Sequence, residues 1–214
     1  MAIEELRVGG SVKLRGPIKL NVVDVAGSLS VEGDIEAGIL KIRGSADIDG
    51  NVKGNEIRVS GSFKASNRVE VNELEVSGAA KAKSIMGGRV EVSGSLKAEE
   101  IRVRELRIAG RLSAENAYAD KIYIARDSEV HGTITGCYIE IGRDAEVDKV
   151  VGDTVIIRRG VEADYVEARR VLVERDAEIV ELRYVERADI SIDAYVLKRE
   201  KIENLSVELT CREE

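Results

Sequence analysis

Apolar and polar residues alternate along most of the chain in a pattern that returns every 16 or 17 residues. A corner residue marks each repeat, and apolar side chains stand four and two positions before it, as Val90 and Val92 stand before Gly94. Alternation with a period of two predicts a strand whose apolar side chains face inward. The corner residues are Gly10, Gly27, Gly44, Gly61, Gly78, Gly94, Gly110, Arg126, Arg143, Arg159 and Arg175.

A second alternating strand is predicted just after each corner, with apolar side chains two and four positions beyond it. The volumes at these two positions are complementary: Phe63 is followed by Ala65, whereas the small Ala145 is followed by Val147. We interpret this as the filling of one cross-section of fixed size, in which Leu96 and Leu112 would share a column with Ser128 and Ala177. The remaining third of each repeat is less regular, with pairs such as Ile101 and Val103.

Three short strands per repeat of constant length predict an all-β fold, a single-stranded three-sided β-solenoid. We expect about 11–13 coils of 16–17 residues, stacked by backbone pairing with a spacing of about 4.8 Å. The repeat length, with its loose third side, favours a right-handed helix. Residues 1–185 form the expected β-helix domain, and residues 186–214 a C-terminal cap or irregular last coils.

The composition sets limits on the core and on the partners. One Phe, six Tyr and no Trp in 214 residues leave Val, Ile, Leu and Ala to fill the interior. A net charge of −7 disfavours nucleic acid as a partner. Abundant Glu, Lys and Arg are typical of thermophiles. Without a signal peptide or a long apolar run, we expect a cytoplasmic protein with no membrane span. Cys137 and Cys211 support neither a disulfide framework nor a zinc site.

The repeats resemble the coils of bactofilins, which are polymer-forming cytoskeletal proteins. The resemblance lies in VDVAGSLSVEGDIEAG (residues 23–38), IRVSGSFKA and VEVSGSLKA, and its pattern covers most of residues 10–180. It implies a right-handed three-sided β-helix that assembles end to end into filaments without a nucleotide. Phe63, the only Phe, lies near the middle of the chain and does not match the aromatic residue near the helix end that helps this family polymerise.

The ends of a solenoid present unpaired backbone groups, so they are candidates for self-association. The pattern starts almost at once, with Leu6 and Val8, which leaves little chain for an N-terminal cap. In the C-terminal region, Tyr195, Leu197, Ile202 and Leu205 could fold over the last coil or extend it. The inner column continues there less regularly through Leu205 and Val207.

Two outward-facing columns stand out. The first column carries Lys64, Lys81 and Lys97, then Glu129, Glu146, Glu162 and Glu178. One interpretation is a solvated ion-pair network in which the corner arginines offset the repulsion between the glutamates. The other is a surface with separated positive and negative parts that guides association. The second column places Tyr123, Ile156 and Leu172 on one exposed side, interrupted by Glu140. This column is either a partner or self-contact surface or a side covered by the C-terminal segment.

No residue pattern predicts catalysis, a cofactor or a metal ion. His131 is the only histidine, and the flanking VHGTITG reads as a turn. The leading hypothesis is therefore a non-enzymatic scaffold that associates with itself, end to end or side by side. The second is a binding module for a protein or polysaccharide. The third, a β-helix acyltransferase or lyase, would need a cleft with converging carboxylates or His131. The candidate surface residues are Leu6, Val8, Tyr123, Ile156, Leu172 and Tyr195.

Overall fold

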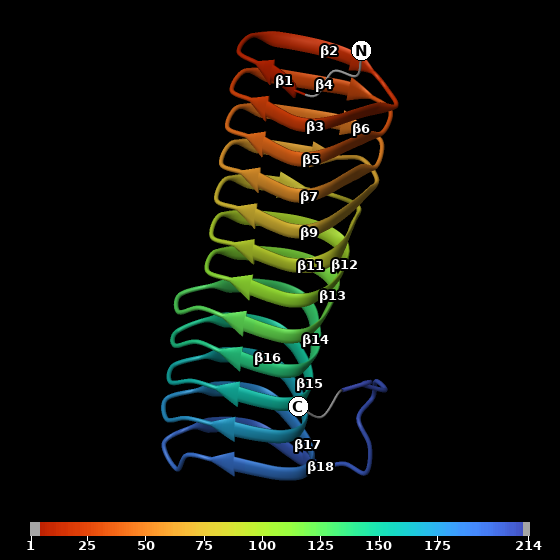
Figure 1. The fold of residues 1–214 in the computed structure, drawn as a ribbon. Coiled ribbons are helices and arrows are strands. Elements are labelled where there is room, and N and C mark those ends of the chain that lie inside the picture. Colours follow the sequence, from red (N-terminus) through yellow and green to blue (C-terminus); the bar gives the residue numbers. More distant parts are fainter. Residues whose placement is uncertain (1–4, 212–214) are drawn as a thin grey trace. The chain divides into compact units, whose positions relative to one another are not determined.

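The computed structural model describes residues 5–211 and contains strands and turns only. Residues 1–4 and 212–214, at the outer ends of the two expected regions, lie outside the described residues. The chain forms two compact units, Met1–Val103 and Arg104–Glu214, and each consists of parallel β-coils (Figure 1). About 12 turns follow one another along the chain, so the prediction of an all-β solenoid is confirmed.

The strand bounds follow the repeat. The first unit contains β1 (Glu5–Val8), β2 (Ser11–Arg15), β3 (Ile18–Val25), β4 (Ser28–Glu32), β5 (Ile35–Ile42), β6 (Ser45–Asp49), β7 (Val52–Val59), β8 (Ser62–Ala65), β9 (Arg68–Val76), β10 (Ala79–Lys81), β11 (Ser84–Val92) and the start of β12 (Ser95–Ile108). The second contains the end of β12, then β13 (Arg111–Ile124), β14 (Glu129–Ile141), β15 (Glu146–Ile157), β16 (Glu162–Val173), β17 (Glu178–Ile190) and β18 (Tyr195–Lys201).

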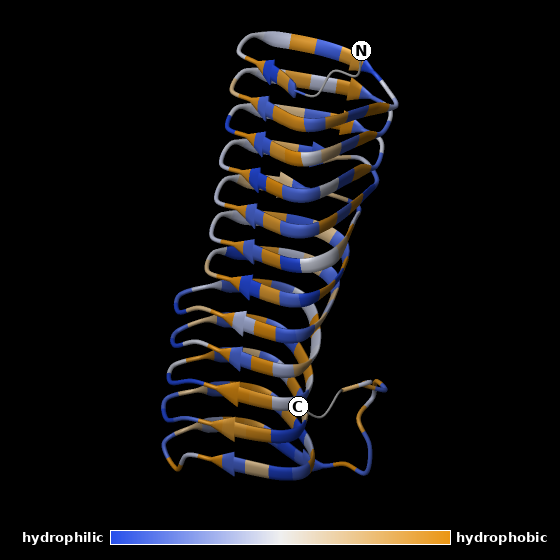
Figure 2. Cartoon of the chain, in the orientation of Figure 1, coloured by the Kyte–Doolittle hydropathy of each residue, from blue (hydrophilic) through white to orange (hydrophobic). Residues whose placement is uncertain are grey.

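Each strand pairs in parallel with the equivalent strand of a neighbouring coil, so like positions stack into ladders. In the first unit Val23 pairs with Leu40, Leu40 with Ile57 and Ile57 with Leu74. All four are at most 1% exposed. Figure 2 shows the resulting alternation of apolar and polar residues along the arrows. The predicted inward columns therefore form the core of both units.

The two units turn their corners differently. In the first unit a Cβ atom on Gly44 would lie 2.1 Å from the carbonyl oxygen of Gly27 in the preceding coil, so only glycine fits there. In the second unit the corners that follow β13 are two residues longer, and Asp127, Asp144 and Asp176 in these corners adopt positive φ angles of 54°, 55° and 59°. Aspartate tolerates this conformation better than most residues. This explains why the corner residue changes from glycine to arginine after Gly110.

The longer corner overturns the predicted complementarity of volumes in the second unit. Leu112 stacks on Val130, and not on Ser128. Val130 then stacks on Val147, and Val147 on Ala163. The small residues Ser128, Ala145 and Ala177 lie at the buried corner itself, each at most 1% exposed. The prediction assumed one corner length throughout, and a register between strands shifts wherever the corner gains residues.

The strands continue beyond residue 185. β17 runs to Ile190, and β18 pairs with it from Glu178↔Tyr195 to Tyr184↔Lys201. Tyr195 and Leu197 therefore extend the stack. Leu205 and Val207 follow the last strand and belong to no coil, so the continuation of the inner column through them is wrong. Within residues 5–211, no helix has the length and apolar character needed to cross a membrane.

Candidate functional site

The first coil leaves one of its edges open. β1 pairs with β3, and β2 pairs with β4, both on the side of the following coil. Among residues 5–211, no strand pairs with the other edge of β1 or β2. Val8 is 2% exposed, but Leu6, Val12 and Leu14 are only half-buried because no coil covers them. Of the predicted surface residues, Leu6 thus lies at this edge and Val8 inside the core.

The last coil of the second unit is open in the same way. β18 pairs with β17 on one side. Val196 stacks on the buried Ile179 but is itself only half-buried, and Ile192, in the turn before β18, is 97% exposed. A strand edge without a partner presents backbone N–H and C=O groups that can pair with another chain. Each terminal coil thus offers an apolar and hydrogen-bonding edge.

The C-terminal segment, residues 202–211, lies along the flank of the coils and not across the end. It leaves the last coil where the Ile202 N–H donates to the Tyr184 carbonyl at 2.9 Å, and the Ser206 N–H then donates to the Glu167 carboxylate. Cys211 reaches Cys137 in β14. The segment therefore runs back past β17 and β16 toward β14 (Figure 1). We call it the flank segment.

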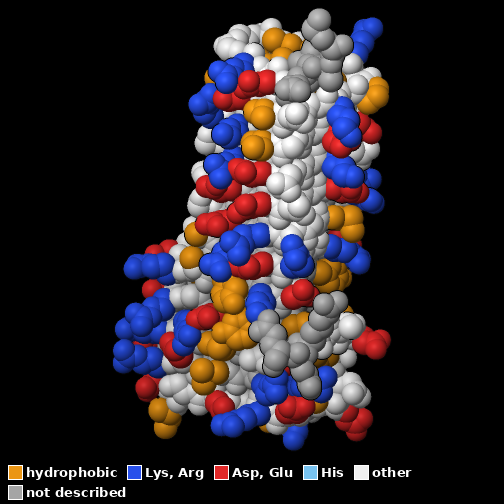
Figure 3. All heavy atoms as spheres, viewed as in Figure 1, with side chains coloured by type: hydrophobic (Ala, Val, Ile, Leu, Met, Phe, Trp, Pro, Cys, Tyr) orange, Lys and Arg blue, Asp and Glu red, His pale blue; other side chains and the backbone are white. Residues whose placement is uncertain are grey.

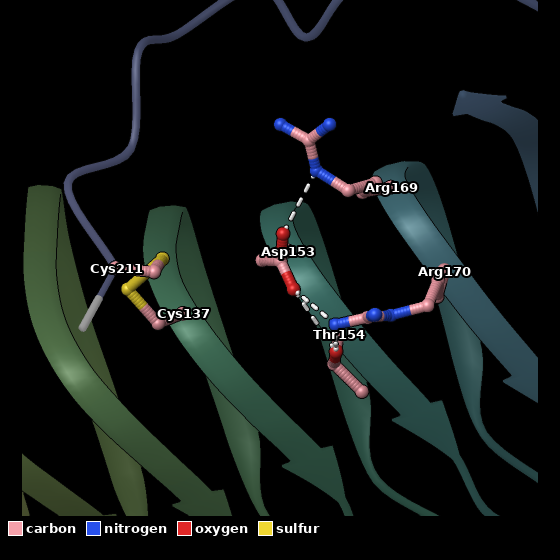
Figure 4. The surroundings of a disulfide bond; sticks show 6 residues. All are labelled: Cys137, Asp153, Thr154, Arg169, Arg170 and Cys211. Carbon is pink, nitrogen blue, oxygen red and sulfur yellow. Dashed lines mark hydrogen bonds and ion pairs between the residues drawn. A yellow bond between two sulfur atoms is a disulfide. The ribbon is translucent and has the colours of Figure 1, made fainter. Parts of the chain in front are cut away.

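Cys137 and Cys211 form a disulfide, with Cα atoms 5.5 Å apart and 74 residues apart in sequence (Figure 4). The interpretation that these cysteines support no disulfide is corrected here. Sequence spacing could not reveal the pair, because the two residues meet only when residues 202–211 turn back along the flank. Such cross-links persist in oxidising compartments and in the cytoplasm of hyperthermophiles.

The flank segment covers outward-facing positions that would otherwise meet water. In β14, β15 and β16, three successive residues are buried, for example Val150, Val151 and Gly152. Since neighbouring strand residues point to opposite faces, such a run requires cover on both sides. Thr135, Val151 and Glu167 are the outward residues, at 3%, 0% and 1% exposure. The adjacent valines 150 and 151 broke the alternation and could have signalled this cover.

Glu167 is a buried carboxylate with several donors. Burial acts to raise its pKa, but the Ser206 backbone N–H and the Tyr165 hydroxyl, 2.5 Å from the carboxylate, outweigh burial and lower the pKa of Glu167. Burial and the same hydrogen bond raise the pKa of Tyr165 to about 12. Glu167 therefore stays ionised and holds the flank segment through a charge-assisted bond.

Asp153 organises a second polar cluster beside the disulfide (Figure 4). It accepts from Arg169 at 2.9 Å and from Arg170 at 2.7 Å, and Arg170 also reaches the Thr154 hydroxyl at 3.1 Å. Each arginine extends from β16 toward β15, so the cluster ties neighbouring coils together. Every member of the cluster is hydrogen-bonded to another member, as is expected of a network that stabilises the fold.

The tyrosine column exists as predicted. Tyr123 pairs with Glu140, Glu140 with Ile156, and Ile156 with Leu172. Leu172 is 40% exposed, while Tyr123 and Ile156 are half-buried. The Tyr123 ring lies 5.8 Å from that of Tyr138. The flank segment does not cover this column fully, so it stays available as a contact surface.

Arg158 pairs with Glu140, the charged member of that column. Arg158 bridges Glu140 at 2.6 Å and Glu174 at 2.8 Å, on the coils before and after its own. Hydrogen bonds to Glu174 and Glu140 raise the pKa of Arg158 and keep it charged. This ladder of alternating charge supports the stacking of three coils.

A groove runs along the coils of the first unit. It has a volume of about 610 Å³, and its floor includes Asn21, Gly38, Asn55 and Asn72. The Asn72 amide donates to the Asn55 side-chain oxygen at 2.7 Å. Lys19 and Glu36, 2.8 Å apart, stand on one wall. Figure 3 shows a pale stripe between columns of charged side chains on this unit.

His131 contacts Asp148 at 3.3 Å on an exposed face. Among the residues that the structure describes, no group of three or more His, Cys, Asp or Glu side chains is arranged to hold a metal ion. Comparison of the chain with profiles of known protein families, with curated proteins and with solved structures finds no match.

Proposed function

We propose that the protein is a non-enzymatic structural scaffold that associates with itself end to end, in the manner of a bactofilin-like filament. The observation that carries the proposal is the pair of open coil edges, one at β1 and β2 and one at β18. The flank segment supports it, because this segment could have capped the last coil and instead lies along the side of the coils.

The physical argument is that the ends repeat the interface found between coils. Within each unit, neighbouring coils pair by parallel backbone bonds and bury apolar ladders. A second copy that placed its β1 and β2 on β18 would continue both features. It would cover the half-buried Val12 and Leu14 of one copy and the exposed Ile192 of the other. No nucleotide is needed, since the stabilisation comes from burial and backbone pairing.

The test is light scattering with negative-stain microscopy over a range of protein concentrations. We expect filaments or short linear oligomers from the intact chain. A carboxylate in Val12→Glu would lie at the open edge, where a lone copy can solvate it and a stacked copy would bury it. This variant should form no filaments while keeping its melting temperature. Val22→Glu, at an outward-facing, half-buried position on the side of β3, is the matched control. Filaments from Val12→Glu equal to those of the parent would refute the proposal.

The second candidate function is a binding module, and the groove in the first unit favours it. Its amide and charged side chains can donate and accept hydrogen bonds along successive coils, as an extended polysaccharide requires. Binding of soluble polysaccharides, measured by calorimetry and abolished in Asn55→Ala/Asn72→Ala, would support this function. The exposed tyrosine column would serve a protein partner in the same way.

A cytoplasmic location also belongs to this proposal. The disulfide accords with it only for a source whose cytoplasm tolerates such bonds, as in hyperthermophiles. The Glu-, Lys- and Arg-rich composition is consistent with such a source. Counting free thiols in protein extracted under alkylating conditions would decide whether the bond exists in the cell.

A further inference from the structure

The outward positions near the starts of β14 to β17 carry carboxylates on successive coils. Glu129 pairs with Glu146, Glu146 with Glu162, and Glu162 with Glu178. Asp148 and Asp164 stand two residues further along β15 and β16. We define the acidic face as Glu146, Asp148, Glu162, Asp164 and Glu178.

Most of this face lacks counter-charges in the part of the chain that the structure describes. Glu129 is bound by Arg111 at 2.6 Å, and Asp148 contacts His131. Among residues 5–211, Glu146, Glu162, Asp164 and Glu178 have no ion-pair partner. The corner arginines were expected to offset these charges, but Arg126 and Arg159 bind the corner aspartates, each at 2.9 Å. For these two arginines that expectation is wrong, and the repulsion along the ladder is left for an external partner to relieve.

Apolar side chains continue the acidic face toward the last coil. Tyr195 pairs with Glu178 across the ladder and is 61% exposed. Val180 and Leu197 are 51% and 64% exposed and, together with the acidic face, line a hollow of about 260 Å³. Large apolar side chains gathered beside a charged patch mark interaction surfaces.

The first unit carries a matching surface of opposite sign. Lys64 pairs with Lys81, and Lys81 with Lys97, on β8, β10 and β12. Lys64 lies 3.3 Å from Asp47, while Lys81 and Lys97 have no ion-pair partner among the described residues. Two residues before each lysine stands a small side chain, namely Ser62, Ala79 and Ser95. The lysine side chains therefore extend beyond their smaller neighbours. We define the basic face as Lys64, Lys81 and Lys97.

We propose that the acidic face of one copy docks on the basic face of a second copy. This interface rests on the proposed self-association and gives that association a lateral contact. Both faces repeat once per coil, at the spacing of paired strands of about 4.8 Å, so several carboxylates and lysines can meet in register. The methylene stems of the lysines can pack on Val180, Tyr195 and Leu197 while their ammonium groups meet the acids. Because two different patches meet, the contact is heterologous.

The experiment uses two charge-reversed variants of the full chain. Glu162→Lys/Glu178→Lys makes both faces basic, and Lys81→Glu/Lys97→Glu makes both faces acidic. Mass is measured by size-exclusion chromatography with light scattering at low and high salt. The parent should form oligomers that salt weakens. Each variant alone should lose association by about tenfold or more in Kd, and an equimolar mixture should regain it. Asp120→Lys and Lys53→Glu, exposed positions outside the two faces, should behave as the parent does.

The outcomes separate this interface from the end-to-end contact. Val12→Glu should abolish filaments and leave the salt-sensitive association in place. Salt-sensitive association that persists in both charge-reversed variants, or that an equimolar mixture of them fails to regain, would overturn the lateral interface and leave the end contact standing. A parent that stays single at every salt and protein concentration would overturn both proposals.

Discussion

Removal of the Cys137–Cys211 bond should destabilise the second unit and loosen the flank segment. The perturbation is Cys137→Ser/Cys211→Ser, which keeps side chains of similar size and abolishes the cross-link. The bond closes a loop with a sequence separation of 74, which includes the end of β14 and all of β15 to β18. Its loss therefore releases the last coils as well as the flank segment.

The magnitude follows from the loop length. In the chain-entropy account, a cross-link with this separation lowers the entropy of the unfolded chain by about 15 cal/mol/K, or about 4.5 kcal/mol at 25 °C. Loss of a native disulfide from a small domain costs about 2–5 kcal/mol in practice. We expect a loss of about 2–4.5 kcal/mol in the free energy of unfolding of the second unit.

Two measurements check this expectation. Guanidinium denaturation followed by circular dichroism gives the free energy of unfolding, and the midpoint should fall in the serine variant. Hydrogen exchange should be faster at Ser206, whose amide donates to Glu167, and at Val151 beneath the flank segment. A reducing agent should move the parent to the same midpoint and leave the serine variant unchanged.

Two results would refute the reasoning. One is an unchanged denaturation midpoint together with unchanged hydrogen exchange at Ser206 and Val151, which would mean that the bond does not constrain the chain. The other is a parent that shows two free thiols under native, non-reducing conditions. The paired reductant control separates the effect of the bond from that of the substitutions themselves.

Three other predictions follow from particular contacts. Gly44→Ala should lower the free energy of unfolding by about 3 kcal/mol, because the added Cβ atom would meet a backbone oxygen. Gly9→Ala should cost little, because the space around Gly9 is open. Equal melting temperatures for the two variants would contradict the corner argument. Glu167 has a lowered folded pKa, so its stabilisation is present above its unfolded pKa of about 4.3 and is lost as the pH falls through the folded value. Exchange of the Ser206 amide should therefore accelerate in acid, and Glu167→Gln should remove that dependence. Arg158→Met should destabilise by about 1–2 kcal/mol, because the partly exposed Glu140 and Glu174 lose their shared cation. A melting temperature equal to that of the parent would contradict this.

The fold and the inner columns were predictable because they depend on local periodicity. A period of two fixes which side chains face inward, and a repeat of 16–17 residues returns them to the same place in each coil. The pairing of Val23, Leu40, Ile57 and Leu74 follows directly. The exposed tyrosine column follows from the same parity.

The corner geometry and the flank were decided by the tertiary structure. Arginine at the corner position gave no indication that Asp127 would take a left-handed conformation and move Val130 onto Leu112. Residues 202–211 carry a weak alternation that fits another coil as well as a flank, so their path depends on contacts distant in sequence. Cys137 and Glu167 determine that path, and they lie 74 and 39 residues from their partners. Periodicity is a property of neighbours along the chain, whereas a cross-link between distant coils exists only once the chain has turned back on itself.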